Sequence, residues 1–456
     1  MTASALADGA LPRLRHADVL KIAVPITLSN ATVPLIGFVD TAVIGQSGLP
    51  HLMGGVAIGA LIFNMLYWAF SFLRMGTTGL TAQALGAGER RDIAGHLLRA
   101  LLVAIVGGLA LVVLQKQVKA GSFWLMGGSE AVQAAASTYF DIRIWAAPAG
   151  LVNFALLGWF IGLGRAGLAF VIQLILNLLN IGLAIGFVSG LGWSIEGVGY
   201  AAFIAEYVAA AAGLATAFSV ARRMGARAPL SDGLDRRWLR RTFAINSDIL
   251  VRAIAIYGVH IYFTSQGAAA GDVVLAANAL LVNIKSIMIY LLDGFAFAAE
   301  SLVGRAIGAR DRQRFGEAVR LSTWWAGGLA VVVSLAIWFA GPAIIAFTAK
   351  SAEVQAAAVT YLGWAALAPL FGVWCFQLDG IFIGATRTSD MRNTMILSVA
   401  VYLLVAMSLT PSVGNHGLWI AYLVFYIARA MSLAACLPGL MAKAFPPSET
   451  PAQRAS

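Results

Sequence analysis

Charged residues, cysteines and metal-ligand patterns are all scarce in this sequence, and each scarcity removes a class of protein. Charged residues make up 11% of the 456 residues, against 60% hydrophobic residues and a mean hydropathy of +0.82. Soluble domains carry about 25% charged residues, so a water-soluble fold is excluded. The chain has two cysteines and five histidines without metal-ligand spacing. We therefore expect neither a disulfide framework nor a metal site.

The sequence also lacks the motifs of several enzyme classes. It contains no P-loop and no H-E-x-x-H pattern, so ATP-driven transport by this chain and zinc proteolysis have no support. The stretch from Gly162 to Gly167 matches the dinucleotide pattern G-x-G-x-x-G by letter. That reading requires a preceding strand and an acid about 20 residues further on, whereas this stretch lies between apolar runs and position 187 is Phe. We expect no enzyme and no cofactor.

What the chain does contain is about twelve long apolar runs. A helix needs about 20 residues to cross the hydrocarbon core of a bilayer, and a dozen such helices with short loops would use the whole length. The sequence therefore predicts an all-α integral membrane protein with twelve transmembrane helices. The polar ends of the chain leave no room for a soluble domain.

Arginine and lysine alternate from loop to loop. Most of them, including the arginine-rich stretch from Arg222 to Arg241, fall on one side of the predicted membrane, and the other side carries only Lys116, Lys119 and Lys350. Cytoplasmic loops are enriched in these residues. We therefore expect a multi-pass protein of the cell inner (plasma) membrane with both termini in the cytoplasm. A net charge of +10 that alternates in this way does not indicate a nucleic-acid partner.

The chain also repeats itself. The pattern of Phe160–Arg165 recurs in Phe382–Arg387, and that of Leu85–Ala87 recurs in Ile307–Ala309. Each half holds six apolar runs, so both insert with the same orientation. We predict two pseudo-symmetric six-helix lobes, residues 1–221 and 242–456, joined by a cytoplasmic basic linker, residues 222–241. Parallel repeats of this kind occur in transporters that work by alternating access.

Asp40 is the acid that stands out, because it lies in an apolar run that starts at Ile22 and continues past Ile44. A charged side chain in hydrocarbon costs about 2.5 kcal/mol or more, so such residues mark ion or substrate pathways by default. The alternative is an acid near a helix end that reaches outer water. Pro25 and Pro34 lie in the same run and can bend its helix, either as a hinge for a switch or as a static kink.

Other polar residues in the apolar runs are candidates for a transport cavity or for contacts between helices. In the first lobe they are Tyr139, Asn153, Asn177 and Asn180. In the second lobe they are Asp248, Arg252, Lys285, Asp293, Glu300 and Asp379. Asp248 and Arg252 are four residues apart and can pair on one helix face. Lys285 and Asp293 are about 12 Å apart along a helix, so a direct pair is not expected.

Several of these segments together resemble a known family. Phe38–Gly45 resembles the first-helix motif of the multidrug and toxic compound extrusion (MATE) transporters. Leu73–Gln83, Leu292–Glu300 and Leu378–Arg387 resemble its DinF-like branch. The resemblance covers the whole chain. It implies two six-helix lobes and the export of organic cations or other toxic compounds in exchange for protons or sodium.

The resemblance also implies roles for residues. Asp40 would be the coupling acid of the first lobe, Asn180 its polar partner, and Pro25 the position where the first helix bends. One departure matters, because relatives often carry an acid in the fifth helix where this chain has Ala184, and a hydroxyl in the sixth near Ala202. Sodium prefers several oxygen ligands, so this loss weakens a sodium site and leaves proton coupling through one acid.

The hypothesis from the sequence is a secondary active multidrug exporter that exchanges amphipathic or cationic small molecules for protons by alternating access. We expect it to act as a monomer in the lipid bilayer. The alternatives are a flippase for lipids or lipid-linked substrates from the same broad superfamily, a sodium-coupled antiporter, and a channel.

Overall fold

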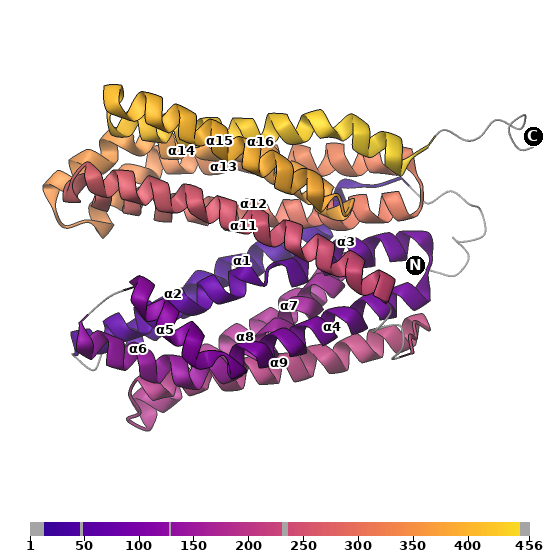
Figure 1. Ribbon diagram of the computed structural model, residues 1–456, viewed down its shortest axis with the longest axis horizontal. Helices are drawn as coiled ribbons and strands as arrows, with labels where there is room; N and C mark the ends of the chain where they lie inside the picture. Colours follow the sequence, from indigo (N-terminus) through magenta and orange to yellow (C-terminus); the bar gives the residue numbers. More distant parts are fainter. Residues whose placement is uncertain (1–12, 46–48, 127–128, 230–235, 447–456) are drawn as a thin grey trace, which may run out of the picture.

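The computed structural model describes residues 13–45, 49–126, 129–229 and 236–446, which form a bundle of long helices in two lobes (Figure 1). The first lobe contains α1 (His16–Gly45), α2 (Pro50–Ala69), α3 (Phe72–Ala87), α4 (Arg90–Val113), α5 (Gln115–Met126), α6 (Glu130–Arg143), η2 (Ile144–Ala146), α7 (Ala147–Gly162), α8 (Ala166–Ile185), η3 (Gly186–Gly190) and α9 (Ile195–Met224). The second lobe contains α11 (Arg236–Ala269), α12 (Asp272–Gly308), α13 (Arg312–Thr348), α14 (Ala352–Gly384), α15 (Thr388–Val413) and α16 (Asn415–Ala444).

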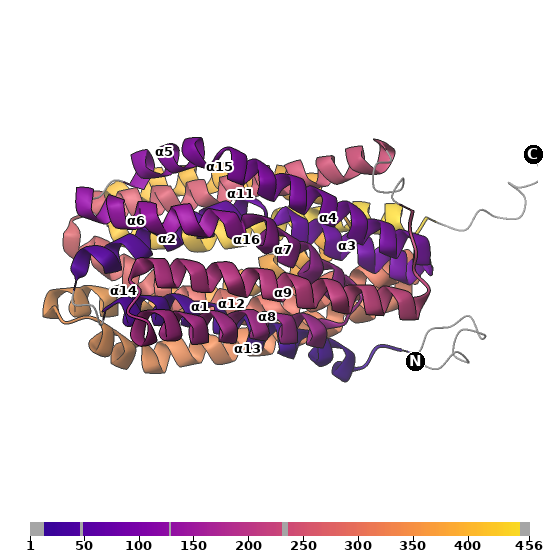
Figure 2. The same cartoon turned by 90° about the horizontal axis from the view of Figure 1, so that it is seen from below.

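The prediction of a twelve-helix membrane protein in two lobes is confirmed. Within the described ranges, eleven helical stretches are long and apolar enough to cross a bilayer, and α1 is the twelfth helix of the bundle. Helices dominate because every backbone polar group must be satisfied within the segment in a medium that offers no water. The helices share one long direction, as the turned view shows (Figure 2).

Two stretches of the first lobe are less regular than the apolar runs predict. The second run is divided into α2 and α3 at Phe70 and Ser71, and the fourth run into α6, η2 and α7. Their counterparts in the second lobe, α12 and α14, are continuous. The short α5, which the sequence did not predict, follows α4. Of the basic linker, residues 222–224 end α9 and residues 236–241 begin α11, while residues 230–235 lie outside the described part of the chain.

The lobes meet at the end of the bundle where α1 begins and α16 ends, which we call the terminal end, and they diverge toward the opposite end (Figure 1). The helix α12 makes most of this contact, because it packs against both α1 and α3. Glycines permit the close approach: a Cβ on Gly308 would overlap the carbonyl oxygen of Gln83, and a Cβ on Gly86 would overlap that of Arg305. Gln83 also crosses to the second lobe, where its amide nitrogen donates to the carbonyl oxygen of Gly384 at 2.8 Å.

Candidate transport site

Asp40 lies inside the first lobe, on α1, with 3% of its surface exposed. Its Oδ1 atom has no hydrogen-bond partner among the residues that the structure describes. The guanidinium group of Arg143 on α6 interacts electrostatically with this carboxylate. Arg143 also donates a hydrogen bond to Tyr139, which is fully buried. The side chain is therefore an interior acid beside a cation, as expected for a functional group in a membrane protein.

A second acid completes this group. Asn153 on α7 donates from its amide nitrogen to the Oε2 atom of Glu206 on α9 at 2.7 Å. Glu206 in turn lies close enough to Arg143 for the two charges to interact. Among the described residues, the group around Asp40 thus contains two carboxyl groups, Asp40 and Glu206, and one guanidinium group, Arg143. The sequence analysis named Tyr139 and Asn153 but missed Arg143 and Glu206, although Glu206 lies in an apolar run like that of Asp40.

The two asparagines of α8 are both buried, with 1% of Asn177 and 3% of Asn180 exposed. Asn177 donates to the hydroxyl of Thr32 on α1 and accepts from Gln173 at 2.9 Å, so it connects two helices. The Oδ1 atom of Asn180 has no partner in the described part of the chain. Ala184, one turn further along α8, is fully buried, so no oxygen ligand is available at that position.

The proposed hinge of α1 stays a prediction. The helix is continuous from His16 to Gly45 and includes both prolines. Pro25 is half-buried, and the side chain of Pro34 lies outside the described residues. Just after Pro25 in the chain, α1 contacts the second lobe. The hydroxyl of Thr27 donates a hydrogen bond to the carbonyl oxygen of Leu291 at 3.2 Å.

In the second lobe, Asp379 on α14 binds two cations with the same oxygen. Its Oδ2 atom accepts from Arg429 on α16 at 2.6 Å and from Arg252 on α11. All three side chains are buried. Removing a charge from water is expensive and is tolerated where the charge is paired, so this triad is a charged core of the second lobe.

The predicted pair of Asp248 with Arg252 is wrong. Asp248 binds Arg392 of α15 at 2.6 Å and accepts a hydrogen bond from Thr388 at 3.0 Å. Spacing along a helix allows two side chains to meet, but packing decides whether a neighbouring helix offers a better partner. Here Asp248 pairs with Arg392 of α15, and Arg252 pairs with Asp379 of α14.

The other candidates of the second lobe all lie on α12 but in different surroundings. Glu300 faces the first lobe and binds Arg74 of α3 at 3.1 Å, which makes it a contact between the lobes. Asp293 is half-buried. Lys285 is 1% exposed, and its Nζ atom lies 3.7 Å from the centre of the Tyr422 ring. Among the described residues, Lys285 and Asp293 form no ion pair, as their spacing predicts.

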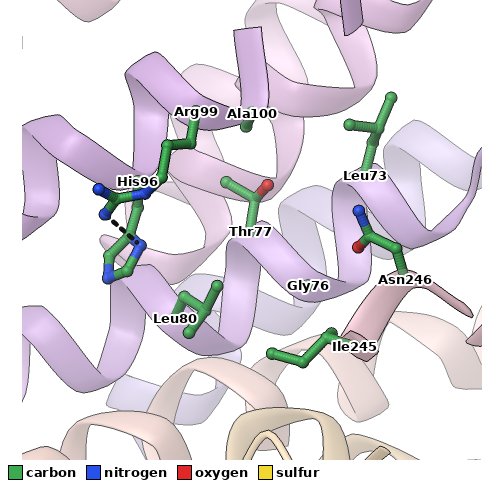
Figure 3. Close-up of a pocket in the computed structure, with 9 residues that line it drawn as sticks. All are labelled: Leu73, Gly76, Thr77, Leu80, His96, Arg99, Ala100, Ile245 and Asn246. Atoms are coloured by element: carbon green, nitrogen blue, oxygen red, sulfur yellow. Dashed lines mark hydrogen bonds between the residues drawn. The ribbon is translucent and has the colours of Figure 1, made fainter. Parts of the chain in front are cut away.

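A separate small pocket lies between α3 and α4 of the first lobe and α11 of the second lobe, near the terminal end (Figure 3). It shares no residue with the group around Asp40. Arg99 and His96, both buried, are in contact at its wall, with 3.0 Å between Arg99 Nη2 and His96 Nδ1. The lining residues are Leu73, Gly76, Thr77 and Leu80 of α3, His96, Arg99 and Ala100 of α4, and Ile245 and Asn246 of α11. The sequence analysis named none of them as a site.

A two-lobed bundle of membrane-spanning helices built from parallel repeats is an architecture found in many transporters. The MatE family model matches residues 25–185 and 250–411, one stretch in each lobe. The chain is 39% identical to DNA damage-inducible protein F of Escherichia coli (strain K12), over 91% of this chain and 90% of that protein. This chain therefore belongs to the MatE family and is a multi-pass membrane transporter, and the members of this family are not, in general, enzymes.

Two further comparisons agree with this family. The chain is 25% identical to the probable multidrug resistance protein NorM of Acinetobacter baylyi, over 87% of this chain and 90% of that protein. A crystal structure described as MATE in the straight conformation superposes with a TM-score of 0.85 at 18% identity, covering 94% of this chain and 96% of that chain. The second comparison supports the fold, and the first links the chain to relatives named for multidrug resistance.

Proposed function

We propose that this transporter exports amphipathic, cationic small molecules in exchange for protons, with Asp40 as the group that binds either the proton or the substrate. The observation that carries the proposal is the position of this carboxylate inside the first lobe, where one of its oxygens has no hydrogen-bond partner among the described residues. Because one acid serves both ligands, the binding of one excludes the other, and exchange becomes obligatory. No cofactor is required.

The driving force is adequate for this exchange. One pH unit across the membrane supplies about 1.4 kcal/mol per proton, and 100 mV supplies about 2.3 kcal/mol per charge. Either is enough for roughly tenfold accumulation or more, since 1.4 kcal/mol corresponds to a factor of ten. The two lobes would expose the site alternately to each side of the inner membrane, and a monomer contains every part of this mechanism.

Sodium is the second candidate for the coupling ion. Asp40, Asn153 and Asn180 each carry an oxygen without a hydrogen-bond donor among the described residues, and such oxygens are ligands for hard cations. The proton is favoured because Ala184 and Ala202 leave two buried positions without an oxygen. A flippase for lipids or lipid-linked substrates is a further alternative.

The decisive experiment is efflux of a fluorescent organic cation from proteoliposomes with proton and sodium gradients imposed separately. We expect wild-type efflux to follow the proton gradient, and Asp40→Asn to remove this dependence because the side chain can no longer exchange a proton. Asp141→Asn is the matched control, since Asp141 is an exposed acid that pairs with Lys119 at 2.7 Å. Undiminished proton-driven efflux by Asp40→Asn would refute the role of Asp40. Dependence on sodium alone would replace the proton as coupling ion.

A further inference from the structure

Lys285 is a cation in the interior of the second lobe that the proposed exchange does not use. It is among the most deeply buried large side chains, with 1% exposed. Its ammonium nitrogen has no hydrogen-bond partner among the residues that the structure describes. It lies on the face of the Tyr422 ring, 3.7 Å from the ring centre, and 6.0 Å from that of Tyr426. A cation–π contact stabilises the charge but supplies none of its three possible hydrogen bonds.

Nearby acids do not neutralise this lysine in the described part of the second lobe. Asp379 binds Arg252 and Arg429, and Glu300 binds Arg74. Asp248 binds Arg392. Asp293 lies on the same helix as Lys285, but eight residues at 1.5 Å each place it about 12 Å further along.

The neighbours of Lys285 on other helices are aromatic or cationic. On α16, Tyr422 and Tyr426 share a face with Arg429, which is seven residues or about 10 Å from Tyr422. On α11, the ring of His260 lies 5.9 Å from that of Tyr422. His260 interacts electrostatically with both Lys285 and Arg429. The surroundings therefore add positive charge and flat apolar surface rather than a counter-charge.

Buried hydrogen-bonding atoms that lack a partner differ in kind between the group around Asp40 and the group around Asp379. Around Asp40 the buried side-chain oxygens without a partner in the described residues are Asp40 Oδ1, Asn153 Oδ1, Asn180 Oδ1 and the Tyr67 hydroxyl, against one charged donor, Arg143 Nε. Around Asp379 the unmatched charged donors are Arg252 Nε, Lys285 Nζ and Arg429 Nε, against one carboxylate oxygen, Asp379 Oδ1. Among these unmatched atoms of the described residues, oxygens predominate around Asp40 and charged donors predominate around Asp379.

We propose that the interior of the second lobe is a binding site for the anionic head group of an amphipathic molecule, with Lys285 as the residue that contacts it. A carboxylate or sulfonate would supply the missing acceptor through a short charge-assisted hydrogen bond. The rings of Tyr422 and Tyr426 would pack against the apolar body of the ligand. The inference rests on the proposed transport function and extends its substrate class from cations to anions and zwitterions.

The test uses binding without any gradient, so that its outcome is independent of proton coupling. The full-length protein in nanodiscs of zwitterionic lipid is titrated calorimetrically with 1-naphthalenesulfonate and, in parallel, with the cation 1-naphthylmethylammonium. We expect Lys285→Met to weaken anion binding by about tenfold or more, because it removes a charge-assisted hydrogen bond. Lys285→Arg should retain most of the affinity for the anion, and neither variant should change binding of the cation. Lys119→Met, at a partly exposed lysine of the first lobe, is the control and should match the wild type.

Several results would overturn the proposal. They are equal anion affinity in the wild type and Lys285→Met, no anion binding by the wild type, or a well-folded Lys285→Arg variant that does not bind the anion. A structure of the wild-type protein with 4-bromobenzenesulfonate gives an answer that does not depend on the folding of variants. Bromine and sulfonate density beside Lys285 Nζ would support the site, and density only elsewhere would refute it. The transport role of Asp40 is judged separately by gradient-driven efflux.

Discussion

At the scale of single residues, the second lobe depends on one carboxylate that serves two guanidinium groups. Asp379 lies between Arg252 and Arg429, and the three side chains come from α14, α11 and α16. A buried ion pair is weak evidence for stability as a whole, but the loss of one member leaves a buried charge without compensation. Asp379 is therefore first a structural residue of this lobe.

Replacement of Asp379 should be costly for this reason. We expect Asp379→Asn to lower the free energy of unfolding by about 3–5 kcal/mol, because two buried arginines lose their shared counter-charge. Thermal unfolding of the purified protein in detergent measures the effect. Asp390→Asn is the control, since it breaks a partly exposed pair with Arg387, and it should cost about 1 kcal/mol or less. Equal stability of the two variants would contradict the assignment.

The sequence indicates which charged residues lie inside apolar runs, but it does not indicate which other residues they pair with. An acid in an apolar run is visible without a structure, which is why Asp40 could be selected and why Glu206 should have been. The partner of an acid depends on which helix packs beside it, and Asp248 illustrates this because it binds Arg392 rather than the nearby Arg252. Roles in coupling, for Asp40 and for the prolines of α1, stay predictions.

At the scale of elements, the close packing of α3 against α12 holds the lobes together at the terminal end. Gly86 and Gly308 each face the backbone of the opposite helix, with no space for a side chain. Glu300 and Arg74 connect the same two helices with an ion pair. A transporter that works by alternating access must separate this contact in each cycle, so its strength sets how easily the lobes part.

A methyl group at Gly308 should weaken that contact. We expect Gly308→Ala to destabilise it by about 1–3 kcal/mol through overpacking. Spin labels at positions 165 and 316, one in each lobe near the terminal end, should then show a larger share of long distances. The labels require a background without Cys375 and Cys436.

Gly327→Ala is the control for this measurement, because a Cβ at Gly327 of α13 meets no atom within 4 Å. We expect this variant to leave the distribution of distances unchanged. An unchanged distribution in Gly308→Ala as well would mean that the α3–α12 contact does not limit separation of the lobes.

At the scale of the whole molecule, basic residues and the lobe contact occur at the same end of the bundle. The start of α1, the end of α16 and the described parts of the arginine-rich stretch, at the end of α9 and the start of α11, lie at the terminal end. The positive-inside rule assigns this end to the cytoplasm. On this prediction the lobes would meet on the cytoplasmic side and diverge toward the opposite face, which would correspond to an outward-directed arrangement.

Reporter fusions test this orientation. Green fluorescent protein fused after Ser456 should fluoresce, because that end is expected in the cytoplasm. Alkaline phosphatase fused at Lys350, between α13 and α14, should be active, because that loop is expected outside. The reverse pattern would invert the orientation and, with it, the assignment of the contact to the cytoplasmic side.

The sequence by itself determined that this chain is a membrane protein of twelve helices in two related lobes, because hydropathy and loop charge act locally and need no partner. It also selected Asp40, since an acid in hydrocarbon is conspicuous wherever it occurs. Only the tertiary structure decided which charges neutralise one another, because that depends on contacts between helices far apart in the chain. For the same reason only the structure showed that, among the described residues, unmatched oxygens gather around Asp40 and unmatched charged donors around Asp379.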